Sequence, residues 1–202
     1  MVRFLASELP PPLGLVVHLS ASTLLGSTSK SKVLSSTVEH AVALGADAVS
    51  VQIQFGDSHE DRMIADAGRV IDHASSLGIP VLLMAHAPAN AGGSCSHALE
   101  AAHAARAAAE IGASIVQTNY AGDPRGLRDI VSGCPIPVVV AGGPRSSSEV
   151  TFLHALRESM RAGAAGVSVG RRIFQAEDPA AIARRIAAIV FEGKPPLVVE
   201  AV

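Results

Sequence analysis

The chain has few of the residues that mark several common classes of protein. Its 202 residues include no tryptophan and one tyrosine, and the formal net charge is −2. Nucleic-acid-binding proteins usually carry basic patches interleaved with aromatic rings, so we expect no nucleic-acid partner. The two cysteines, Cys95 and Cys134, form neither a CxxC pair nor a cluster with histidines at zinc-ligand spacing. We therefore expect free thiols, as in a cytoplasmic protein, and no metal site.

Long apolar runs are lacking as well. The N-terminal MVRFLASELPPP has too short an apolar stretch for a signal peptide, and no run approaches the roughly 18 residues of a membrane span. A soluble, cytoplasmic protein with no membrane partner is expected. Because 49% of the residues are hydrophobic, residues 1–202 can bury one sizeable core and are predicted to form a single domain.

Six short apolar runs are predicted to be strands. They lie within LVVHLS (15–20), LGADAVSVQI (44–53), PVLLMA (80–85), IGASIVQTNY (111–120), PVVVAGG (137–143) and AGAAGVSVGR (162–171). Gly45, Gly112 and Gly163 stand where a helix needs a left-handed residue at its end, just before three of these runs. Since the runs are almost uniformly apolar, they predict burial on both faces, as in a parallel sheet.

The segments between the predicted strands carry helix start signals. These are Ser36 with Glu39, Ser58 with Asp61, Ser146 with Glu149, and Asp178 followed by Pro179. Strands and helices that alternate at roughly 30-residue intervals favour βα units, either in a TIM-type barrel or in an open doubly wound sheet. No GxGxxG opens a helix after the first strand, so the barrel is favoured.

The predicted barrel is incomplete. A full barrel has eight strands, and this chain supplies six, with LVVEAV (197–202) as a possible seventh. An open edge would leave backbone groups unpaired. We therefore expect a homo-oligomer or a partner chain that covers the edge, unless the tail closes the barrel itself.

Candidate site residues follow the apolar runs, because βα barrels carry their sites at the carboxyl ends of the strands. They are His18, Ser20, Gln52, Gln54, His86, Gln117, Asn119, Tyr120, Gly142, Gly143, Gly170 and Arg171. The glycines after the last two runs predict a phosphate site, with Arg171 or Arg172 adding a guanidinium group. The alternative is that these glycines only permit tight turns.

His86 is a candidate acid or base, since an unperturbed histidine pKa lies near 6.5. The alternative is a hydrogen-bonded structural histidine at the end of a strand. The remaining histidines fall mainly in predicted helices, where solvated surface positions are the default. No cofactor is indicated.

Several long stretches resemble the archaeal-type class I fructose-bisphosphate aldolases and the related 2-amino-3,7-dideoxyheptulosonate synthases of the deoxyribose-phosphate aldolase-like superfamily. The similar stretches are VVHLSAST, KVLSSTVEHAVALGADAVSV, IVQTNYAGDP, GCPIPVVVAGGP and AGAAGVSVGRRIFQAEDP. The resemblance implies a (β/α)₈ barrel of which this chain holds the third to the eighth strand. It also implies that the chain begins after the first two βα units and lacks an acidic residue that the family uses.

The resemblance implies a changed active site. The family forms a Schiff base through a lysine in a segment like IVKTNY, and that position is Gln117 here, which cannot form an imine. A tyrosine that serves the family as proton donor aligns with His86, whereas the phosphate-binding stretches AGGP and SVGR are retained. The three lysines, Lys30, Lys32 and Lys194, are the alternative amines.

Three functions remain open. The first is an enzyme that binds a phosphorylated sugar or keto compound, with His86 transferring protons and Gln117, Asn119 or Tyr120 donating hydrogen bonds to an oxygen of the ligand. The second is a non-catalytic phosphometabolite-binding protein or partner subunit. The third is the product of a decayed gene, which the well-kept helix signals disfavour.

Overall fold

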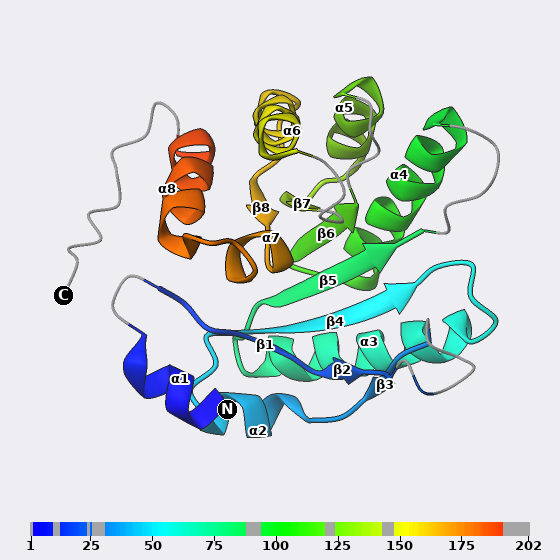
Figure 1. Cartoon of the computed structure of the whole chain (residues 1–202). Helices are drawn as coiled ribbons and strands as arrows, with labels where there is room; N and C mark the ends of the chain where they lie inside the picture. Colours follow the sequence, from blue (N-terminus) through cyan, green and yellow to red (C-terminus); the bar gives the residue numbers. More distant parts are fainter. Residues whose placement is uncertain are drawn as a thin grey trace.

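The computed structural model describes residues 2–9, 13–23, 25, 31–87, 94–119, 124–142 and 148–191. Its centre is a parallel six-stranded sheet (Figure 1). The strands are β1 (Val16–His18), β4 (Ala48–Gln54), β5 (Val81–His86), β6 (Ile115–Asn119), β7 (Val138–Ala141) and β8 (Gly166–Ser168). All six predicted strands are therefore confirmed.

The strand order separates the two predicted architectures. The strands lie in the sheet in the order β1-β4-β5-β6-β7-β8, which is also their order along the chain, and each neighbouring pair is parallel. A doubly wound sheet would reverse direction at a switch point. The unbroken order is that of a TIM-type barrel, and the sheet is an incomplete one, as expected. The tail 197–202, proposed as a seventh strand, lies outside the described residues.

The strands are followed by helices arranged around the outside of the curled sheet (Figure 1). These are α3 (Glu60–Ser76), α4 (Ser94–Ile111), α5 (Pro124–Gly133), α6 (Glu149–Arg161) and α8 (Pro179–Val190). The short α7 (Arg171–Phe174) lies directly after the end of β8, and α1 (Val2–Glu8) and α2 (Val38–Ala43) lie near the N-terminus. An antiparallel pair, β2 (Ser20–Ala21) with β3 (Val33–Leu34), follows β1. None of the described helices is long and apolar enough to cross a lipid bilayer.

The core lies between the sheet and the outer helices. Alternate strand residues point toward α3, α4 and α5, and they are almost completely buried: Val49, Val51, Ile53, Val81, Leu83, Ala85, Val116, Val138 and Val140. Full burial of a Val, Leu or Ile side chain stabilises the folded state by about 1.5–3 kcal/mol. A second cluster joins α6 to α8 through Phe152, Leu156, Ile182, Ile186 and Ile189.

The three glycines predicted to end helices do so in the left-handed conformation. Their φ angles are +95° at Gly45, +108° at Gly112 and +101° at Gly163. At Gly45 a Cβ would also lie 2.9 Å from the Cβ of Ala6, so the glycine permits α1 to approach the end of α2.

The helix starts are only partly as predicted. Asp178 caps α8 by accepting a hydrogen bond from the Ala181 N–H at 2.9 Å, with Pro179 as the first helical residue, and this prediction is confirmed. The other three are wrong by one or two residues. Thr37 rather than Ser36 caps α2, Ser148 rather than Ser146 caps α6, and α3 follows His59, which makes no side-chain cap. Several adjacent Ser and Thr residues made the exact cap ambiguous in sequence.

Candidate functional site

The sheet face that points away from α3, α4 and α5 is polar along β4 and toward the ends of β5 and β6, and we call it the inner face. From β4 it receives Ser50, Gln52 and Gln54, from β5 Leu82, Met84 and His86, and from β6 Ile115, Gln117 and Asn119. These residues alternate with the buried core residues on every strand, which fixes their common side. The strand register aligns them across the sheet, with Gln52 beside Met84 and Met84 beside Gln117.

Gln117 lies in the middle of the inner face. Its neighbours across the sheet are Met84 on β5 and Val139 on β7, and the residue is only 6% exposed. Its amide oxygen Oε1 is buried and has no hydrogen-bond partner. The next residue, Thr118, is 1% exposed and alternates to the helical side of the sheet, so Gln117 lies on the inner face.

His86 ends β5 and contacts the last residue of β6. The Asn119 Nδ2 lies 3.3 Å from His86 Nδ1, and the Gln54 Nε2 donates to the backbone oxygen of His86 at 3.4 Å. Burial is the main cause of a lowered His86 pKa, and the positive charge of Lys32 lowers it further. The imidazole is therefore held in its neutral form at neutral pH.

His18 ends the edge strand β1 and pairs with β4. Its Nδ1 lies 2.9 Å from the hydroxyl of Ser50, the residue beside it in the sheet. The residue stays solvent-accessible, yet partial desolvation of its ring is the largest cause of a lowered His18 pKa, followed by the charge of Lys32. A hydrogen bond to Ser50 opposes these effects, and His86 adds a small lowering. His18 and His86 thus lie within one electrostatic environment.

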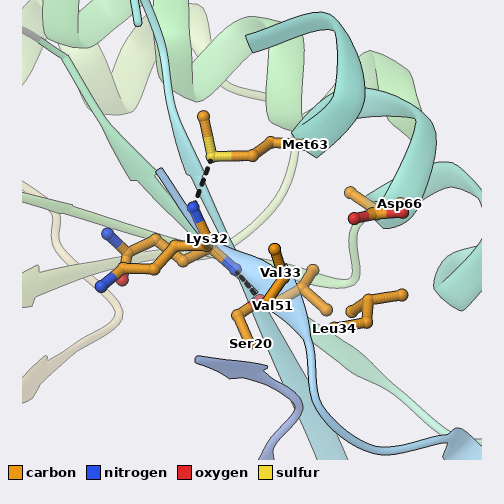
Figure 2. A pocket seen from close by; sticks show the side chains of 9 residues that line it. Ser20, Lys32, Val33, Leu34, Val51, Met63 and Asp66 are labelled. Atoms are coloured by element: carbon orange, nitrogen blue, oxygen red, sulfur yellow. Dashed lines mark hydrogen bonds between the residues drawn. The ribbon is translucent and has the colours of Figure 1, made fainter. Parts of the chain in front are cut away.

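Lys32 stands at the base of the β2–β3 pair, directly before β3. Its backbone N–H donates to the Met63 sulfur at 3.4 Å, and its ammonium group donates to the Ser22 hydroxyl. Figure 2 shows Lys32 between Met63 and Ser20, with Asp66 on the other side of the small pocket that these residues line. Asp66 is paired with Arg69 of α3. In the part of the chain that the structure describes, no carboxylate pairs with Lys32.

Ser20 has a structural partner within the fold. Its hydroxyl accepts a hydrogen bond from the Gln52 backbone N–H at 3.1 Å, and the residue is 9% exposed. This contact ties β2 to β4 beside the inner face (Figure 2).

The ends of β7 and β8 hold the residues predicted to bind phosphate. The Gly142 N–H donates to the Ser168 oxygen at 2.9 Å, so this donor is engaged within the fold. Gly170 precedes α7, and Arg171 is the first residue of that helix and exposed. The Arg172 guanidinium instead stacks over the Phe152 ring, 4.4 Å from its centroid. Of the two arginines, Arg171 is therefore the one available to a ligand.

Two predicted site residues, Tyr120 and Gly143, lie outside the described residues. Among the residues that are described, no three His, Cys, Asp or Glu side chains gather where they could hold a metal ion. Ser50, the partner of His18, was not among the predicted site residues, and Lys32 was predicted only as an alternative amine. The signal for Ser50 was present in AVSVQIQ, where polar residues recur at every second position.

The sequence of the chain matches an aldolase family and two synthases. A family description, "DeoC/LacD family aldolase", matches residues 1–176. A 2-amino-3,7-dideoxy-D-threo-hept-6-ulosonate synthase of Halobacterium salinarum is 41% identical over 184 residues, which cover 91% of this chain and 68% of the relative. A 2-amino-4,5-dihydroxy-6-oxo-7-(phosphonooxy)heptanoate synthase of Streptomyces griseus is 38% identical over 176 residues, or 87% of this chain. The match spans 64% of the length of that relative.

A solved structure agrees with the sequence matches. An archaeal fructose-1,6-bisphosphate aldolase, with its catalytic lysine covalently bound to the carbinolamine intermediate of the substrate, superposes with a TM-score of 0.84 at 29% identity. The alignment covers 93% of this chain and 76% of the aldolase. The resemblance drawn from the sequence motifs is thereby confirmed: the chain belongs to the DeoC/LacD family of aldolases.

Proposed function

We propose that the protein binds a phosphorylated sugar or keto compound on the inner face, and that its carbon–carbon bond chemistry is altered because Gln117 stands where the family has its Schiff-base lysine. The relatives support the ligand class. The Streptomyces griseus relative is named for a product with an oxo and a phosphonooxy group, and the archaeal aldolase is named for a sugar bisphosphate.

The observation that carries the proposal is the position of Gln117. It is a buried carboxamide on the inner face, flanked by Met84 and Val139. The nitrogen lone pair of an amide is delocalised into its carbonyl, so the side chain cannot attack a ketone to form an iminium ion. It can only donate or accept hydrogen bonds at the place where the family forms a covalent bond.

The inner-face residues can still recognise an oxygen atom of a ligand. Neutral His86 and the amide groups of Gln117 and Asn119 are hydrogen-bond donors suited to a carbonyl or enolate oxygen. In this proposal His86 donates its ring N–H, or the proton itself, to an oxygen of the ligand, and His18 and Ser20 contact the polar groups of the ligand. Tyr120, which follows β6 in the chain, is a further proposed donor.

The phosphate group is proposed to bind beyond β7 and β8. Gly142 and Gly143 after β7 and Gly170 after β8 allow close approach to the backbone, and the exposed Arg171 supplies a positive charge. Because the Gly142 N–H already donates to Ser168, Gly143 is the better donor of this pair to a phosphate oxygen.

Reductive trapping tests the proposal. The protein is incubated with sodium borohydride and either dihydroxyacetone phosphate or fructose 1,6-bisphosphate, and its intact mass is measured. A Schiff base, after loss of water and reduction by borohydride, would add the ligand mass less one water plus two hydrogens, and we expect no such adduct. Gln117→Lys is the matched variant that places an amine at the same position. An adduct on the unmodified protein would refute the proposal, and peptide mapping would show whether Lys32 carries it.

A second candidate function is a non-catalytic, ligand-binding or partner subunit. It is favoured by the two changed positions, Gln117 and His86, in a site whose scaffold is otherwise kept. In the described sheet, β1 and β8 are the two edge strands, which a second copy or a partner chain could cover. Light scattering after size exclusion tests this assembly. Ligand-induced stabilisation without turnover of any phosphosugar would favour the non-catalytic function over the enzyme.

A further inference from the structure

We propose that Asn119 is a positioning residue that holds His86 as a neutral imidazole with its proton on Nε2, so that His86 offers a hydrogen-bond donor rather than a base to the inner face. This inference rests on the proposed function in one respect, namely that a ligand with an acceptor oxygen binds on the inner face. The state of the ring itself is a property of the ligand-free chain.

The two residues are brought together by the sheet. Since Met84 pairs with Gln117 in the register of β5 with β6, His86 and Asn119 fall two residues further along on the same side. Both are half-buried, and their nearest side-chain nitrogens are 3.3 Å apart. The backbone oxygen of His86 also accepts a hydrogen bond from Gln54, which fixes the end of β5.

The tautomer follows from the chemistry of the amide. The Asn119 Nδ2 is an NH₂ group, which can donate hydrogen bonds and cannot accept them. In the amide orientation of this structure Nδ2 is the atom that faces the ring, so the His86 Nδ1 carries a lone pair. A neutral imidazole has one N–H, so the proton resides on Nε2.

The surroundings oppose a second proton on the ring. Burial and the positive charge of Lys32 both lower the His86 pKa, and no carboxylate is among the causes of its shift. The other titratable group in this environment is His18 of β1, which His86 influences weakly. At neutral pH the ring is therefore uncharged, with one donor and one acceptor nitrogen.

This arrangement defines what His86 can do. With Nδ1 occupied by Asn119, the ring meets a ligand through Nε2–H, and a neutral imidazole in this state polarises a carbonyl or stabilises an enolate oxygen by donating. It cannot abstract a proton through Nε2, which has no free lone pair. The ligand group that it recognises is therefore an acceptor oxygen.

Nuclear magnetic resonance of the ¹⁵N-histidine-labelled, ligand-free protein at pH 7.5 tests the inference. The ring nitrogens of His86 are assigned by comparison with His86→Gln. We expect Nδ1 to resonate as an unprotonated nitrogen and Nε2 as a protonated one. A ring protonated mainly on Nδ1, or on both nitrogens, overturns the proposal. Because this readout needs no ligand, its failure is distinguishable from a failure of the phosphosugar-binding proposal.

Asn119→Asp is the informative variant, since a carboxylate has nearly the shape of the amide but only accepts hydrogen bonds. We expect it to move the ring proton to Nδ1 and to raise the His86 pKa. Asn119→Leu, which neither donates nor accepts, should leave a mixture of the two tautomers. If the ring of Asn119→Asp keeps its proton on Nε2, Asn119 does not position it.

Discussion

Gln117 lies beside Met84 in the pairing of β5 with β6, and its amide oxygen is buried there without a hydrogen-bond partner. The cost of leaving a buried polar group unpaired is about 1–3 kcal/mol. The fold therefore carries a destabilising polar group at the position that the sequence resemblance assigns to the Schiff-base lysine of the family.

Replacing Gln117 with Met should raise the free energy of unfolding by about 1 kcal/mol, because a side chain of similar length without polar atoms removes the unpaired oxygen. Urea unfolding followed by circular dichroism measures the change. Thr118→Val is the matched control, since the Thr118 hydroxyl is also buried and unpaired but faces the helices. Both variants should be stabilised, and only Gln117→Met should alter the thermal shift caused by phosphosugars. Destabilisation of Gln117→Met by more than about 1 kcal/mol would contradict this account.

Removal of the Lys32 charge should raise the pKa of both His18 and His86. The lysine cation disfavours each imidazolium ion, so Lys32→Met takes away part of the lowering in both rings. Proton resonances of the two rings, followed from pH 4.5 to pH 8, give the values. Arg69→Met is the matched control, since it removes a cation of α3 that is paired with Asp66. A Lys32→Met protein whose two histidines titrate as in the parent would show that Lys32 does not act on the site.

Acidification should destabilise the protein through the same histidines. Because the folded-state pKa of His86 is lowered, the unfolded chain takes up a proton first as the pH falls below about 6.5. This contribution is therefore fully present above that pH and is lost progressively below it, until the folded-state pKa is reached. The free energy of unfolding in urea is measured at pH 7.5 and at pH 5.5. The difference between these two free energies should be smaller for His86→Gln than for the parent. An equal difference in parent and variant would exclude His86 as its source.

Arg171→Ala should abolish thermal stabilisation by fructose 1,6-bisphosphate, because it removes the exposed guanidinium beside Gly170. Arg172→Ala is the comparison, since that side chain stacks on Phe152. It should lower the melting temperature of the free protein and keep the response to the ligand. If Arg171→Ala responds like the parent, the phosphate does not bind at the start of α7.

The fold could be predicted from the sequence because its signals are local. Apolar runs preceded by glycines marked the strands, and the left-handed φ angles of Gly45, Gly112 and Gly163 confirm the reason for those glycines. Exact helix starts could not be predicted, since neighbouring hydroxyl residues such as Ser36 and Thr37 are equally good caps in sequence. The backbone conformation of the folded chain makes Thr37 the cap.

The site was only partly predictable. Position at or near the predicted end of an apolar run was enough to select His18, His86 and Gln117, although Gln117 is the third residue of β6 in the structure. The partners of the two histidines, Ser50 and Asn119, come from adjacent strands 32 and 33 residues away and depend on the register of the sheet. β4 alternates between apolar side chains that pack against helices and polar side chains that lie on the inner face. The prediction of an almost uniformly apolar strand missed this alternation.

The matching order of strands in chain and sheet has a consequence for how the molecule folds. Each strand of the sheet pairs with the next sheet strand along the chain, and one helix lies between the two. Between β1 and β4 the short β2–β3 pair is inserted as well. The chain segments that connect paired strands are therefore of similar, moderate length. Assembly can then grow outward from β4 and β5, which share the longest run of paired residues in the sheet. Backbone amides of these two strands should exchange with deuterium last, and those of β1 and β8 first.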